Sequence, residues 1–308
     1  MANLTLLSRR KIVKVALETV AKGTAAVTTT YILAFDAEMK PAGDWIQRQP
    51  GSKFLGNIAG MPGNLGATCT FRAELRGNGA SANFDAGVAA CLQGCGLKLA
   101  TATYTPDSDI ADQQTISIDL YEDGLLKQMI GAMGTVRFSG VFGQQMFAEF
   151  EFSGVWQAPT DVALATASYA ATIPPTLKST TFTCPAGFTP FTANVGVDLQ
   201  NTVSAVEDIS KAGGISHYVI TERDPIITLD SQADLVATNS VYAAWLAGTE
   251  VAFSLLVGGV AFNKFTIAAP KLQYREVSPG DRDGKLLHEV TGQCNASSGD
   301  DELTIVCS

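Results

Sequence analysis

The chain has 308 residues, of which 46% are hydrophobic and 17% charged, so it can bury a large core and is not expected to be disordered. Its formal net charge is -9, and no Lys/Arg-rich run follows residues 9–11, which excludes the basic footprint of a protein that grips nucleic acid. No apolar run of about 18 residues is present, so no membrane span is expected. An apolar segment follows the basic residues 9–11, but Lys14 and Glu18 interrupt it, so no secretion signal is expected either.

The first 66 residues give mixed signals. Residues 11–23 fit either a short helix or a strand. Residues 28–35 are rich in β-branched and aromatic side chains, which favours a strand. Residues 36–66 contain many Gly and Pro and little periodicity, and we expect a long loop or arm there. A loop of this length in a compact domain is usually functional, and in an assembling protein it would reach a neighbouring subunit.

A half-buried strand and a short helix are expected next. Apolar and charged residues alternate over 70–76, which is typical of a strand with one buried face. Apolar residues then recur at helical spacing over 84–95. Asn83 or Asp85 is suited to cap the start of this helix.

Strands dominate the following segment. Residues 116–121 alternate between apolar and polar, and Asp123-Gly124 comes shortly after them. An Asp-Gly pair between alternating runs favours a tight β-hairpin, because Gly accepts positive φ. Two more strands are expected over 135–141 and 146–153.

The chain is expected to divide into two domains. A Pro-containing stretch, 159–175, separates two segments of similar plan, so we predict domains over 1–165 and 166–308, with the arm 36–66 in the first. The elements expected after it are a strand at 215–221, a helix at 241–246 closed by Gly248, strands at 251–255 and from Phe265 to Pro270, a turn at 281–284 with Gly284 at positive φ, and a strand at 301–307.

The two halves also match directly. A shift of 115 residues gives six identities in 15 positions without a gap. The identical pairs are Val136/Val251, Phe138/Phe253, Ser139/Ser254, Gly143/Gly258, Phe147/Phe262 and Phe150/Phe265. We therefore expect a duplicated small β domain that carries one helix per copy.

No catalytic, metal or cofactor constellation is visible. The only histidines, His217 and His288, lie in strand patterns, and neither has ligand spacing. The Gly-x-Gly pairs lack the Lys-Ser/Thr of a phosphate loop. Free thiols are expected at all six cysteines, Cys69, Cys91, Cys95, Cys184, Cys294 and Cys307. We expect a non-enzymatic protein without cofactor or metal.

Paired carboxylates remain as candidate site residues. Glu149 with Glu151, and Asp281 with Asp283, have a spacing that would suit a glycosidase only if they converged in a cleft. Solvated faces or contacts between subunits are the favoured interpretation. Arg282 between the two aspartates fits either a simple turn or an ion-pairing node between subunits, and both alternatives stay open.

An ordered series of segments resembles the phage tail tube proteins. The matching segments are 70–78, 90–96, 104–106, 115–124, 131–138, 152–161, 269–274, 278–284 and 300–305. No single motif is specific, but their order is. The resemblance covers roughly residues 10–160 and 190–308, and it is sparse over 36–66 and 160–190.

This resemblance implies a mainly β fold of tandem sandwich or barrel domains, each with a flanking helix. It implies a structural virion protein, made late, that polymerises into stacked rings and forms the channel for genome ejection. Two domains per chain imply a trimer with pseudo-sixfold symmetry rather than a hexamer. The expected partners are further copies, the terminator and tape measure proteins, and DNA that passes without specific binding; no membrane is involved. The implied location is the virion tail, assembled in the host cytoplasm.

Two other classes remain as alternatives. A capsid decoration or tail-tip protein would also be β-rich, acidic and free of catalytic residues. A carbohydrate-active enzyme would instead need its carboxylates to converge.

Overall fold

The computed structural model describes residues 5–51, 53, 55–178, 181–183, 191–238 and 240–308. The fold is mainly β, as expected, with 55% of the chain in strands and 5% in helices. The described residues form two helices, α1 (Ala86–Gly94) and α2 (Val241–Ala247). Both lie where the sequence predicts them, and α2 ends at Gly248 in the left-handed conformation, as expected.

The strands before the predicted boundary surround a long central strand, β8. In chain order they are β1 (Lys11–Leu17), β2 (Thr30–Ile32), β3 (Ala34–Ile46), β4 (Met61–Glu74), β5 (Leu97–Ala100), β6 (Thr103–Pro106), β7 (Ile116–Glu122), β8 (Leu125–Val141) and β9 (Phe147–Asp161). Asp123 and Gly124, both at positive φ, connect β7 to β8 as a two-residue turn. The ambiguous segment 11–23 is thus a strand at its start, because β1 pairs in register with β7.

The remaining strands extend the same sheet. They are β10 (Thr181–Thr183), β11 (Thr192–Asp198), β12 (Thr202–Glu207), β13 (Ile215–Glu222), β14 (Ile226–Gln232), β15 (Glu250–Val257), β16 (Phe265–Arg282), β17 (Lys285–Asn295) and β18 (Thr304–Cys307). Only β12 and β13 form a separate two-stranded sheet; the other sixteen described strands belong to one sheet.

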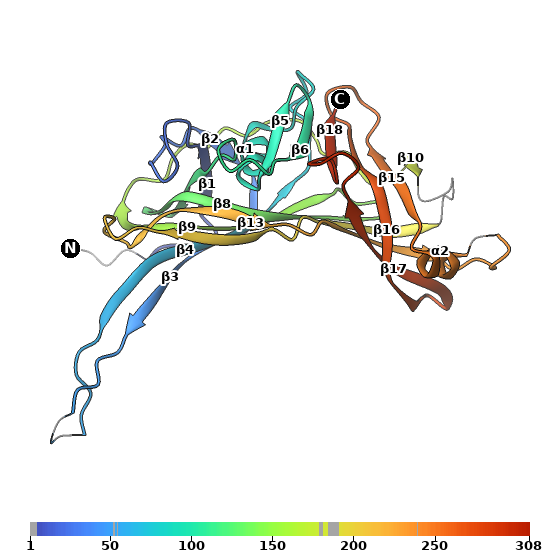
Figure 1. The fold of residues 1–308 in the computed structure, drawn as a ribbon. Helices are drawn as coiled ribbons and strands as arrows, with labels where there is room; N and C mark the ends of the chain where they lie inside the picture. Colours follow the sequence, from blue (N-terminus) through green and yellow to red (C-terminus); the bar gives the residue numbers. More distant parts are fainter. Residues whose placement is uncertain (1–4, 52, 54, 179–180, 184–190, 239) are drawn as a thin grey trace.

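Strand β8 joins the two halves of this sheet. Its first part pairs with β7, and its last five residues pair with β11 along the same edge, while β9 occupies the other edge. From β11 the sheet continues through β14 to β17 and β16, of which the last two are labelled in Figure 1. Strand β18 then links β16 to β6, so the C-terminal strand also pairs with the first half.

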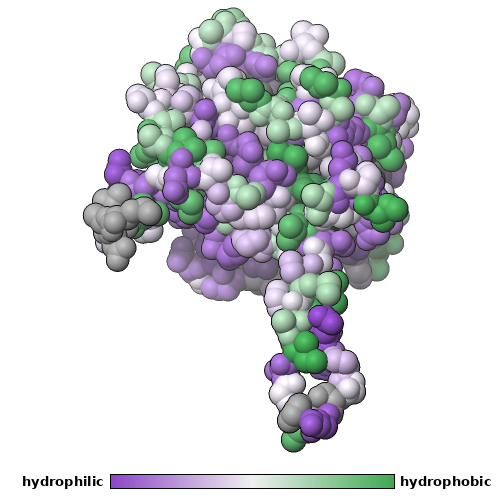
Figure 2. All heavy atoms as spheres, turned by 90° about the vertical axis from the view of Figure 1, so that its left-hand side faces the viewer, coloured by the Kyte–Doolittle hydropathy of each residue, from purple (hydrophilic) through white to green (hydrophobic). Residues whose placement is uncertain are grey.

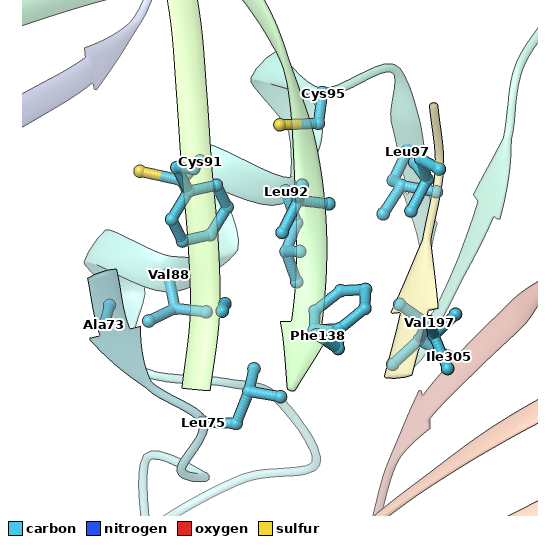
Figure 3. Packing of buried hydrophobic residues seen from close by; sticks show 14 of the residues in the cluster. Ala73, Leu75, Val88, Cys91, Leu92, Cys95, Leu97, Phe138, Val197 and Ile305 are labelled. Carbon is cyan, nitrogen blue, oxygen red and sulfur yellow. The ribbon is translucent and has the colours of Figure 1, made fainter. Parts of the chain in front are cut away.

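One hydrophobic core runs through both halves. Figure 3 shows Phe138 of β8 packed near Val197 of β11, with Leu97 of β5 and Ile305 of β18 beside them. Helix α1 covers this core and contributes Leu92, among others. The predicted boundary between residues 165 and 166 falls in a stretch, 162–175, without helix or strand, and the division into two domains stays a prediction.

Of the two expectations for residues 36–66, a long loop or an arm, the arm is present, but it consists of strands and not of a loop. Most of it forms the hairpin of β3 and β4, which projects from the body as a narrow arm (Figure 1). The strands escape notice because a hairpin that leaves the body has no buried face, and so shows no alternation. Strand β16 also runs through Pro270, where the sequence predicts an end. Pro270 is tolerated because the β15 ladder shifts register there and the β17 ladder begins only at Lys271.

The ungapped match between the halves does not extend to strand pairing. Val136 of β8 lies opposite Phe150 of β9. Val251, its counterpart under the shift of 115, lies opposite Leu272 rather than Phe265. The two hairpins therefore use different registers, and the aligned phenylalanines of their second strands do not occupy equivalent ladder positions.

Candidate functional site

The outer face of the sheet beside the arm carries a concentration of charge. Along β4, β8, β9 and β11 the inward residues are apolar, as with Phe71 and Phe138, and every second residue turns outward. We call the outward set on this side the charged face. It consists of Asp36, Arg72, Arg137, Glu149, Glu151 and Asp198, which line one shallow depression.

Strand register aligns five of these residues into a row. Arg72 of β4 lies opposite Glu149 of β9, and Glu149 lies opposite Arg137 of β8. Arg137 in turn lies opposite Asp198 of β11. At the other end Arg72 forms an ion pair with Asp36 of β3. The signs alternate along the row, and each arginine lies between two carboxylates.

The two glutamates predicted from sequence thus lie on this face, although in different settings. Glu149 accepts a hydrogen bond from Ser139 Oγ at 3.1 Å and is flanked by arginines. Glu151 is exposed and lies opposite Thr70 and Thr135. The pair is on an open sheet surface, and a contact between subunits stays a prediction for both.

The turn at 281–284 lies at the tip of the β16–β17 hairpin. Asp283 and Gly284 have positive φ, and Arg282 pairs with Lys285 across the turn. Arg282 Nη1 is 2.7 Å from Asp230 Oδ2 of β14. Asp230 also accepts hydrogen bonds from the N–H groups of residues 193 and 194 at the start of β11. Arg282 therefore has a partner within its own chain, and its expected role between subunits, together with that of Asp281 and Asp283, stays a prediction.

The arm exposes large apolar side chains. Trp45 is 68% exposed, and Leu55 at the tip is fully exposed. Figure 2 shows further hydrophobic residues along the arm, which stands clear of the body. Among the residues of the arm that the structure describes, the other large exposed apolar side chains are those of Ile46, Ile58, Met61 and Leu65. An isolated two-stranded hairpin is marginally stable in water, so this surface is suited to burial against another protein surface.

The sheet is open at long edges. In the described part of the chain, the 13-residue strand β3 pairs only with β4, which leaves its other edge unpaired. At the far end β15 pairs with β16, while on its other side β10 covers only Ser254–Leu256. Such edges present backbone N–H and C=O groups that accept a further strand.

A buried carboxylate that the sequence did not reveal organises the first half. Glu18 is 5% exposed and accepts four hydrogen bonds. The donors are Gly23 N, Thr115 Oγ1, Ser117 Oγ and Gly131 N, at 2.6 to 2.8 Å. Four donors satisfy the carboxylate, so the charge is tolerated in the core. A single Glu in a segment of ambiguous pattern gives no signal for this role.

A second polar cluster ties the C-terminal segment to the first half. Arg223 pairs with Asp300 and Glu302, and its Nη2 lies 2.9 Å from Ser108 Oγ. Burial raises the pKa of Asp300, but hydrogen bonds from Ser108 and the charge of Arg223 outweigh it, so the net pKa lies below the usual value. These contacts close one side of an open hollow between residues 108–113 and 293–302.

The remaining polar candidates do not gather into a reactive centre. Burial and the nearby charge of Lys22 lower the pKa of His217, and His288 packs edge-on against Tyr242. Within the described residues, no group of three His, Cys, Asp or Glu side chains is arranged to hold a metal ion. Five cysteines are buried free thiols, Cys69, Cys91, Cys95, Cys294 and Cys307, whereas Cys184 lies outside the described residues. Burial raises the pKa of Cys69 and Cys294 to about 12, which keeps both unreactive.

Comparison with known proteins adds no assignment. Neither helix of the described chain has the length and apolar character needed to cross a bilayer. The sequence matches no protein-family model and no curated protein.

Proposed function

We propose that this protein is a structural subunit that associates through its sheet edges into rings, and that the rings stack into a tube like that of long-tailed phages. The observation that supports this most is the join at β8. Within one chain, β11 takes over the edge of β8 where β7 ends, and so two sets of strands become one sheet. A ring of subunits requires the same kind of join between chains.

The free edges offer places for that join. β3 and β15 lie at different ends of the sheet, so an edge-to-edge contact between them is heterologous and closes into a ring when the rotation per subunit fits. Pro41 within β3 has no N–H to donate. The pairing we propose is therefore confined to the part of β3 before Pro41.

The arm supports stacking in addition to ring closure. Over residues 36–66 three basic residues, Lys40, Arg48 and Lys53, balance three acidic ones, Asp36, Glu38 and Asp44, so the arm carries no net charge (3 - 3). The rest of the chain carries -9, because 18 basic residues stand against 27 acidic ones. A neutral arm is not repelled by the acidic body of another copy, and its exposed Trp45 and Leu55 can become buried there. On this proposal the tube belongs to the virion tail, with terminator and tape measure proteins as further partners.

Electron microscopy of the purified full chain tests the proposal. We expect rings and hollow tubes, and an end-on view with threefold symmetry and six similar units. A monomer at every concentration would overturn the proposal. Discrete trimers that never stack would favour a decoration protein instead.

A matched pair of variants tests the arm. Gly43 and Leu65 are cross-strand partners, so Asn-Gly in place of residues 44–64 closes the shortened hairpin with a two-residue turn. The control, Val20→Ser, removes an exposed apolar side chain outside the arm. We expect the shortened arm to leave the circular dichroism spectrum unchanged and to abolish long tubes, while the control still forms them. Tubes of normal length from the shortened protein would exclude a role of the arm in stacking.

A further inference from the structure

The charged face holds two exposed arginines in a protein of net charge -9. Arg72 lies on β4 and Arg137 on β8, the two strands that flank β9, and both side chains extend from a rigid sheet. Guanidinium groups fixed in this way are well suited to bind phosphate, since each donates two parallel hydrogen bonds to its oxygens. Two exposed arginines side by side would, without other groups, form a site that holds a nucleic-acid backbone.

The carboxylates in the row remove this capacity. Side chains opposite each other across neighbouring strands have Cβ atoms about 5 Å apart, which is within reach for Arg and Glu. Arg72 has Asp36 on one side and Glu149 on the other, and Arg137 has Glu149 and Asp198. Three carboxylates against two guanidinium groups leave the row with a charge of -1 (2 - 3).

The carboxylates are themselves held in place. Asp36 has positive φ and is ion-paired with Arg72, whose guanidinium also lies over the Phe147 ring at 5.4 Å. Asp198 Oδ1 accepts a hydrogen bond from Gln200 N at 2.9 Å. Glu149 accepts one from Ser139. The alternation therefore rests on backbone register and on local hydrogen bonds, and not on chance approach of mobile side chains.

We propose that the row Asp36–Arg72–Glu149–Arg137–Asp198 is a self-neutralised surface past which double-stranded DNA moves without being held. This inference rests on the proposed function, because it takes the charged face as part of the channel wall. Five strands about 4.8 Å apart make the row about 19 Å wide. Along this width a phosphate that approaches either arginine meets a carboxylate on both sides, and these negative charges repel it.

Removing the carboxylates while keeping the arginines tests the proposal. The test variant is Asp36→Asn/Glu149→Gln/Asp198→Asn, in which each amide keeps the shape of the side chain, and Asn tolerates the positive φ at position 36. The control variant, Asp161→Asn/Glu207→Gln/Asp234→Asn, changes net charge by the same +3 at exposed carboxylates for which the described structure has no ion pair. Binding of a short fluorescent DNA duplex is measured by anisotropy at low salt.

The expected result is specific to the row. The test variant binds the duplex at least about tenfold more tightly than the control variant, which stays close to the unmodified protein. Two additional phosphate contacts steepen the dependence of log K on log salt by about 1.8, so most of this advantage disappears between about 50 and 200 mM salt. Equal binding by both variants would show that net charge alone matters and would overturn the proposal. Tight binding by the unmodified protein would overturn it as well.

The same samples separate this inference from the proposed function. If rings and tubes form but the test variant gains no affinity, the self-neutralised row is wrong and the tube stands. If the protein never assembles while the test variant gains affinity, the row neutralises its arginines but the channel does not exist. Circular dichroism and the unfolding midpoint of each variant establish that the fold is kept.

Discussion

Helices α1 and α2, the two helices in the described part of the chain, follow strands at similar points of their halves but lie in very different environments. Seven of the nine residues of α1 are buried, whereas Val241 is the only buried residue of α2. Strands β1, β2 and β5 pack around α1, while α2 packs chiefly on β16 and leaves Leu246 76% exposed. A helix with the same signal in the sequence can thus be a core element or a surface element. What decides is how many other segments of the chain return to cover it.

The largest expected effect is a difference in the free energy of unfolding between a variant in α1 and a matched variant in α2. Leu92→Ala in α1 removes a fully buried side chain and should lower the free energy of unfolding by about 3 kcal/mol, through lost burial and a cavity. Leu246→Ala in α2 should change it by less than about 0.5 kcal/mol. Urea unfolding of dilute protein measures both. If both substitutions lowered the free energy of unfolding by similar amounts, this would contradict the conclusion that the rest of the chain covers α1 far more fully than α2.

An intermediate effect concerns the segment after β1, which packs beside α1, and the side chain that anchors it. The segment after β1 faces α1 across a shared hollow, and Glu18 anchors this segment to β7 and β8. Gly23 N–H and Gly131 N–H bond to different oxygens of Glu18, so Glu18→Gln replaces the acceptor of one of them by an NH2 donor and removes the charge from the remaining bonds. We expect a loss of about 2 kcal/mol. Hydrogen exchange should rise in α1 and not in α2; a uniform rise would mean that Glu18 supports the whole fold instead.

The smallest expected effect concerns the contact between the halves near Asp300. The folded-state pKa of Asp300 is lowered, so its ionised form stabilises the fold above the unfolded pKa, about 3.9, and this contribution is lost as the pH falls through the folded value. Asp300 is partly exposed, so the contribution should stay below about 1 kcal/mol. The free energies of unfolding of Asp300→Asn and of the unmodified protein should differ at pH 7, and this difference should shrink as the pH falls below the unfolded pKa of about 3.9. A constant difference would assign the effect to something other than this ionisation.

Much of the local structure could be predicted because it depends on neighbouring residues. Asp123-Gly124 required positive φ, and Gly248 ended α2 as a left-handed cap. An arm was expected over 36–66, but its strands were missed because neither face of the projecting hairpin is buried, so these strands lack the alternation by which strands are recognised. The pairing of β8 with β11 links distant residues, for example 138 and 197, which are 59 positions apart (197 - 138), and no local pattern specifies it.

The same limit applies to the charged face. Each member shows the expected local signal, a polar residue between apolar ones, as Arg137 does between Val136 and Phe138. The row itself exists only through strand register, which a one-residue slip would destroy by turning these side chains inward. Glu149 could be predicted as a candidate from sequence, but its two arginine neighbours could not.

The link between β18 and β6 has a consequence for how the chain reaches its final state. Ile305 pairs with Tyr104, 201 positions earlier (305 - 104), so this closure is among the most distant in the sequence. Pairings of such separation form slowly, because the intervening polypeptide must first be brought together. A chain halted before residue 303 would leave the β6 edge and the Phe265 side chain open to solvent, and such intermediates associate nonproductively. Refolding yield should therefore depend on concentration more steeply than native stability does.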